Sequence, residues 1–124
     1  MRVTEAQLAR LREIASIERN VILEHLGREG QDPAESLTIV PSVDELVVRE
    51  LRDDLLEERG REAEFLLARL AGRSSADDAA EHRRNADELE FSLLREIAEA
   101  CPALTAGVWE AAGRLGTGFR AAAP

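Results

Sequence analysis

The sequence predicts an all-α protein, a single domain over residues 1–124. We expect an antiparallel bundle of three long helices with a shorter fourth helix at the C-terminus. Three observations predict this class. Apolar residues recur every three or four positions over long stretches, pairs with helix-capping spacing recur along the chain, and aromatic residues make up only 3% of it. A charged content of 33% with so few aromatic residues favours helices packed through leucine, isoleucine, valine and alanine.

The first predicted helix runs from Thr4 to Gly27. Thr4 and Gln7 have the spacing of a capping box, in which a hydroxyl and an amide satisfy backbone donors at the helix start. Residues 28–41 follow, rich in glycine, aspartate, proline and serine, and are predicted to form a long loop. Its last residues, 37–40, are β-prone. We interpret them as an extended piece that crosses the bundle or pairs with the same segment of a second copy.

The second and third helices carry similar start signals. Ser42 and Glu45 form a second capping pair, and the apolar stripe that follows runs to Leu70, before Gly72. A third capping pair, Ser75 with Asp78, predicts a helix that continues to about residue 101, where Pro102 ends it. Both helices have apolar spacings of three and four residues, which is typical of coiled-coil-like packing. The stripe of the second helix includes Val48, Leu51, Leu55 and Leu66, and that of the third includes Leu89, Leu93 and Ile97.

The last segment, residues 103–119, is predicted to be a weak amphipathic helix, because four glycines interrupt it. We interpret it as the fourth helix that closes the bundle. The less favoured alternative is contact with a membrane, or with a partner's groove, around Val108 and Trp109. Long helices with narrow apolar stripes often complete their core by dimerising, so we expect a homodimer.

The net charge and the composition restrict the kinds of partner and the cellular compartment that we expect. The net charge of −9 argues against general nucleic-acid binding, since phosphate contacts require clustered cations, and favours a basic protein partner. All 16 basic residues are arginine, and with the abundant alanine this indicates a GC-rich bacterial genome. The single cysteine, Cys101, has no intrachain disulfide partner, and Met1 leads directly into a helix. We therefore expect a cytoplasmic protein.

Acidic residues interrupt the apolar stripes. Glu18 projects onto the middle of the stripe of the first helix, with His25 close to the same line, and Glu62 onto that of the second helix. Burying an unpaired charge is costly, so these acids require arginines, a metal, a ligand or water as partners. Because carboxylates suit Mg, Mn and Fe, the sequence yields a candidate divalent-metal set. It consists of Glu18, Glu58, Glu62, His82 and Glu90.

Two families of metal-binding bundles resemble this pattern. The ferritin-like diiron proteins also hold carboxylates in mid-bundle, although this chain has none of their Glu-x-x-His motifs. Residues 55–64 and 86–91 resemble the two acidic segments of the all-α nucleotide pyrophosphohydrolases. That resemblance implies Mg²⁺ held against the phosphates of a nucleotide. Arg61 and Phe91 stand where the family's pattern has acids.

Taken together, these patterns favour binding over catalysis. We expect a small acidic bundle that acts by protein–protein interaction, as an adaptor, regulator or assembly component, with itself and one further protein as partners. No cofactor is expected. The alternative is a metal-binding bundle of the ferritin-like or pyrophosphohydrolase-like kind. If the protein acts by binding alone, we expect Glu18, Glu58 and Glu62 to form ion pairs with Arg52, Arg59 or Arg83, or to lie at an edge of the stripe.

Overall fold

The chain is all-helical in the computed structural model, which describes the backbone of residues 1–71 and 76–115 and the side chains of residues 1–59 and 88–114. These described ranges contain no strand. The predicted all-α class is therefore confirmed. In chain order the elements are α1 (Glu5–Arg28), α2 (Pro33–Ile39), α3 (Val43–Ala71), α4 (Ala76–Ala100), the 3₁₀ turn η1 (Pro102–Leu104) and α5 (Thr105–Leu115).

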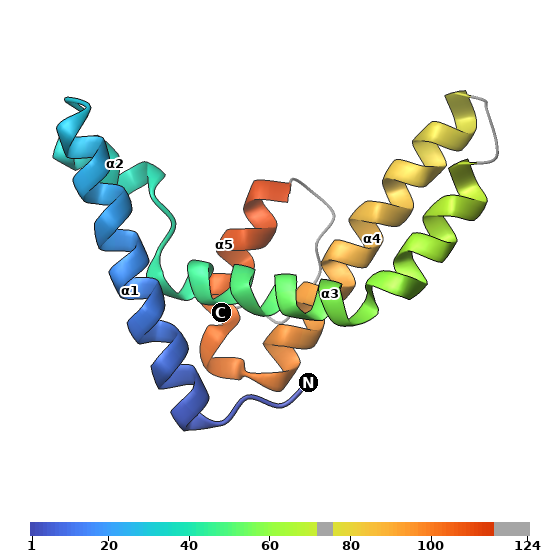
Figure 1. Cartoon of the computed structure of the whole chain (residues 1–124), viewed down its shortest axis with the longest axis horizontal. Helices are drawn as coiled ribbons and strands as arrows, with labels where there is room; N and C mark the ends of the chain where they lie inside the picture. The colour runs from blue at the N-terminus through green and yellow to red at the C-terminus, as the bar shows by residue number, and fades with distance from the viewer. Residues whose placement is uncertain (72–75, 116–124) are drawn as a thin grey trace.

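Helix α3 forms the centre of the fold. It packs against α1, α4 and α5, and α5 also packs against α4. Figure 1 shows α1 diverging from one part of α3, while α4 lies beside the other part, so that two arms open away from each other. Helix α5 occupies the angle between the arms, and α2 lies against α1. The long first helix is therefore an arm of the molecule and is not enclosed by it.

The predicted starts of the first two long helices are confirmed. The Thr4 hydroxyl accepts a hydrogen bond of 3.1 Å from the Gln7 N–H, and the Gln7 side chain accepts one of 2.9 Å from the Thr4 N–H. At α3 the Ser42 hydroxyl accepts a bond of 3.1 Å from the Glu45 N–H. The predicted boundaries agree with α1, α3 and α4 to within a residue or two. The third capping pair and the stop at Gly72 lie outside the described residues.

The long loop predicted over residues 28–41 is wrong in its middle, because α2 forms there. Asp32 caps this helix: its carboxylate accepts a hydrogen bond of 3.0 Å from the Ala34 N–H. Pro33 at the first helical position supplies a φ angle that suits the helix. The capping signal outweighs the β propensity of the residues that follow, so the predicted extended piece is wrong as well.

The core lies where α3, α4 and α5 meet. The stripes predicted for the second and third helices supply much of it, which confirms that part of the sequence interpretation. The buried apolar residues from these stripes are Val48, Leu51, Leu55, Leu93 and Ile97. Long aliphatic side chains thus do the packing that the low aromatic content implied.

The predicted fourth helix closes this core. Leu104 and Val108 are fully buried, which fits the interpretation of this segment as part of the bundle. Residues 116–119 of the predicted helix lie outside the described ranges. Gly107 lets α5 approach α3 closely: a Cβ built on it would lie 2.7 Å from the backbone carbonyl carbon and oxygen of Asp44. At this position the backbones themselves are in contact.

Replacing Gly107 with alanine should destabilise the fold, because the new methyl group would meet backbone that cannot rotate away. We expect the free energy of unfolding of Gly107→Ala to fall by about 1–3 kcal/mol. The matched control is Gly113→Ala in the same helix, where nothing lies within 4 Å of the added Cβ. That change should raise stability by about 0.5–1 kcal/mol. Urea denaturation of both variants measures the difference, and equal effects would contradict the close approach.

Candidate functional site

The start of α3 holds α5 through a buried acid. Glu45 is 1% exposed, and its two carboxylate oxygens accept hydrogen bonds of 2.8 and 2.9 Å from Nε of Arg114 on α5. Arg49 lies 3.0 Å from the same carboxylate. Next to it, the Ser42 hydroxyl donates to Glu110 of α5 at 2.8 Å. The buried charge is therefore compensated by two arginines, as a buried carboxylate requires.

The same turn of α3 also positions α1. Asp44 accepts hydrogen bonds from Nε and Nη2 of Arg12 at 2.9 and 3.3 Å, and the hydrogen bond raises the pKa of Arg12 above its ordinary value. About two helical turns further along α1, Arg19 donates to the Pro41 carbonyl at 3.2 Å. Two arginines of α1 thus fix the rotation of this helix about its own axis. Which face of α1 points outward follows from them.

Helix α1 carries apolar side chains on two faces. Its inner face, on which Leu8 and Ala15 are buried, packs against α3. The outer face, by which we mean Ile14, Ile17 and Val21, points away from the core. These three side chains are 49%, 60% and 59% exposed. Within the described residues, α1 packs against α2 and α3, and neither covers the outer face.

The expectation that Glu18 faces the core is wrong, because its side chain is exposed. At about 100° per residue, Glu18 projects midway between the inner and the outer face. A helical projection of the sequence merges the two faces into one broad stripe and so places Glu18 at its centre. His25, close to the same line, is exposed too. Neither residue therefore requires a buried partner.

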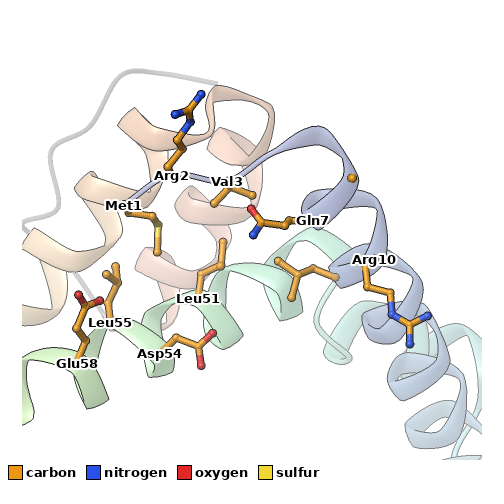
Figure 2. A pocket seen from close by; sticks show the side chains of 11 residues that line it. Met1, Arg2, Val3, Gln7, Arg10, Leu51, Asp54, Leu55 and Glu58 are labelled. Carbon is orange, nitrogen blue, oxygen red and sulfur yellow. The ribbon is translucent and has the colours of Figure 1, made fainter.

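An open pocket of about 650 Å³ lies between the N-terminal segment, α1 and α3. Figure 2 shows Leu51 and Leu55 on α3 opposite Met1 and Val3, which together form an apolar floor. The other lining residues are Arg2, Ala6, Gln7, Arg10, Leu11, Asp54 and Glu58. The lining contains no histidine, cysteine, serine or threonine, and its two carboxylates belong to Asp54 and Glu58. Its chemistry suits the binding of an apolar side chain.

The pocket and the outer face of α1 form one continuous track. Arg10 lines the pocket and lies four residues before Ile14, which places both on the same side of the helix. Ile17 and Val21 follow at the spacings of three and seven residues that define a single helical stripe. An elongated partner lying along α1 would meet the outer face and the pocket together.

The other members of the predicted metal set differ in their surroundings. Glu58 is exposed at the pocket, and Glu90 is half-buried on α4, where its carboxylate lies 3.7 Å from Nε of Arg52. Arginine partners were expected for Glu18, Glu58 and Glu62 and not for Glu90, so this contact leaves that expectation untested. The side chains of Glu62 and His82 lie outside the described residues. Among the side chains that are described, no group of three or more histidines, cysteines, aspartates or glutamates is placed to hold a metal ion. The metal site stays a prediction.

A second ion pair joins α3 to α4. Arg59 donates a hydrogen bond of 2.7 Å to Glu96, and this bond is the main reason that the pKa of Glu96 lies below its ordinary value. Burial opposes the shift, while the Met1 ammonium, 3.5 Å away, adds to it. The pair therefore stabilises the packing of α4 on α3 only while Glu96 is ionised.

The buried acid at the start of α3 was not predicted as a site, although a signal for it exists. Leu46, Val47 and Val48 form three consecutive apolar residues, and all three are buried. A helical turn that is apolar on every side is surrounded by other elements. Glu45, directly before this run, is therefore enclosed as well, and the sequence assigned it only a capping role.

Removing the arginine that compensates Glu45 should destabilise the fold. We expect Arg114→Met to lower the free energy of unfolding by about 1–3 kcal/mol, because a buried carboxylate loses a charge-assisted hydrogen bond. The control is Arg10→Met, since the Arg10–Glu13 pair is exposed at 3.6 Å and its loss should cost at most about 0.5 kcal/mol. Denaturant unfolding of dilute protein measures both. Equal losses would mean that Glu45 is not effectively buried.

The Arg59–Glu96 pair predicts a pH dependence with a definite sign. Because the pKa of Glu96 is lowered on folding, its stabilising effect is present above the ordinary value of 4.5 and is lost as the pH falls through the lowered value. The difference in Tm between the wild type and Glu96→Gln should therefore shrink below about pH 4.5. Arg59→Met should remove the same dependence. A difference that is constant from pH 7 to pH 3 would contradict this role of Glu96.

Two further findings bear on function. The described helices include none that is both long and apolar enough to cross a membrane. No protein-family model, curated protein or solved structure matches the chain.

Proposed function

We propose that this protein acts by protein–protein interaction, as an adaptor, regulator or assembly component, through the outer face of α1. The observation that carries the proposal is the exposure of Ile14, Ile17 and Val21 on a helix whose other exposed side chains are mainly polar or charged. Contiguous exposed apolar surface rimmed by polar residues is typical of protein contact sites. The rim here consists of Arg10, Glu13, Glu18, Glu24 and His25, all exposed.

The occupant that this surface suits is another helix. A stripe with spacings of three and four residues along a straight helix accepts a second stripe of the same kind, knob into hole. The adjoining pocket, with its floor of Leu51 and Leu55, offers an additional recess for one large side chain at the end of such a helix. The net charge of −9 keeps the protein soluble with this face exposed.

Catalysis receives less support than binding. The metal-binding alternative depends on Glu62 and His82, which lie outside the described side chains, and no observation within the described residues favours it. Residence in the cytoplasm likewise stays a prediction. The outer face of α1, by contrast, needs no metal or other additional group to bind a partner.

The proposal predicts that a single charge on the outer face abolishes binding. Ile17→Glu should fold normally, because residue 17 is 60% exposed, but it should lose partners that the wild type retains. The matched control is Ala9→Glu, which adds the same charge to an exposed position roughly 110° around α1 from the middle of the outer face. Quantitative capture from a lysate of the source cell, with an untagged copy of the chain included, compares the three proteins.

Loss of at least one bound protein with Ile17→Glu but not with Ala9→Glu is the expected result. If the bound proteins, including the untagged copy, are the same for all three, the outer face is not a contact surface. Circular dichroism melts of both variants should match the wild type and so separate loss of binding from loss of folding.

A further inference from the structure

We infer that the occupant of the outer face is α1 of a second copy, and that the two α1 helices pair in antiparallel orientation. This inference rests on the proposed function and names its partner. The pairing is isologous: each copy presents the same stripe, as a two-fold dimer requires. The observation behind it is the order of charges at the two ends of the exposed stripe.

Read as a heptad seam, the outer face continues past its apolar centre into charged residues at both ends. A heptad has two positions that face the partner helix. Ile14 and Val21, seven residues apart, occupy one of them, and Ile17 occupies the other. The same two positions fall on Gln7 and Arg10 toward the N-terminus of α1, and on Glu24 and Arg28 toward its C-terminus. The central layers are therefore apolar. The seam residue next to them is the cation Arg10 on the N-terminal side and the anion Glu24 on the C-terminal side, with Arg28 beyond it.

Charge complementarity selects the antiparallel orientation. In a parallel pair, Arg10 would lie against Arg10 of the second copy, and Glu24 against Glu24 of the second copy, so both seam ends would repel. In an antiparallel pair the Arg10 end of one helix meets the Glu24 end of the other, twice by symmetry. Both side chains are free to do so, because their present ion pairs, with Glu13 at 3.6 Å and with Arg28 at 3.3 Å, are exposed.

One register brings the apolar residues together as well. When Ile14 of one copy is level with Ile17 of the second copy, the two isoleucine pairs form the centre of the interface. Val21 is then level with Arg10 of the second copy and can pack against its aliphatic stem. Glu24 lies level with Gln7 of the second copy, within one helical turn of Arg10 of the second copy.

The geometry of the arm makes this pairing sterically accessible. The arginine contacts to α3 turn the outer face away from the core, and Figure 1 shows α1 as one diverging arm. Helix α1 is 24 residues long, which corresponds to about 36 Å. An interface along this length buries an area at the low end of the range for specific dimers. We therefore expect a Kd on the order of 10 μM.

Sedimentation equilibrium of the purified full chain tests the dimer. The wild type and Ala9→Glu should dimerise with similar Kd, and Ile17→Glu should weaken the dimer at least about 100-fold. A wild type that stays monomeric up to about 1 mM would overturn the inference. So would a dimer that Ile17→Glu leaves unchanged. Stripe-dependent capture of a different protein by a monomeric wild type would leave the proposed function standing while this inference falls.

Disulfide cross-linking tests the orientation. In a Cys101→Ala background, which removes the buried native thiol, one chain carries Arg10→Cys and another carries Val21→Cys. Antiparallel pairing makes these two positions level, so that mixing the chains under mild oxidation should give the mixed disulfide. Either variant alone should form few disulfides, because the cysteines of its two paired copies then lie about 16 Å apart along the helix axis. Disulfides between two copies of the same variant, with little mixed disulfide detected by mass spectrometry, would overturn the antiparallel arrangement.

Discussion

The first turn of α3 is the constraint on which the rest of the structure depends. Within four residues it supplies the hydroxyl of Ser42, the carboxylate of Asp44 and the buried carboxylate of Glu45. The first and last of these bind α5, and the middle one binds α1. The backbone of Asp44 also touches Gly107 of α5. One short segment therefore fixes two helices that are far apart in the sequence.

Such a junction works because its charges are compensated where they are buried. Glu45 is enclosed by Leu46, Val47 and Val48, and two arginines reach it from partly exposed positions. The arginine stems cover apolar surface while their guanidinium groups remain close to water. An ion pair at this place contributes directionality that an apolar contact lacks, because the Nε–H of Arg114 has to point toward the two oxygens of the Glu45 carboxylate.

The exposure of the outer face is a consequence of this junction. Arg12 and Arg19 hold α1 against the start of α3. The inner face then packs in the core, and the outer face has to point away from it. A helix with one apolar face has no such remainder. The two faces of α1 therefore link the internal packing of the molecule to its proposed ability to bind another helix.

Much of the fold was predictable from local signals. Capping at Thr4 and Ser42 and the stripe through Val48, Leu51 and Leu55 gave the helices and part of the core, because these patterns act over a few residues. Helix α2 was missed because the Asp32–Pro33 capping signal was not recognised in a segment rich in glycine, proline and β-prone residues.

The candidate site was predicted less well. Periodicity alone does not say which of two apolar faces meets the core, and that choice depends on the long-range contact between Arg12 and Asp44. Glu18 was assigned to the core for this reason. The same limitation hid the exposed face of α1, which is the feature that carries the proposed function.

The most direct test of the central claim is hydrogen–deuterium exchange at several protein concentrations. If the outer face of α1 is covered by a second copy, amides between residues 10 and 24 should exchange more slowly as the concentration rises, while α5 should be unaffected. Exchange in α1 that is the same at every concentration would contradict the account, because the face would then remain uncovered.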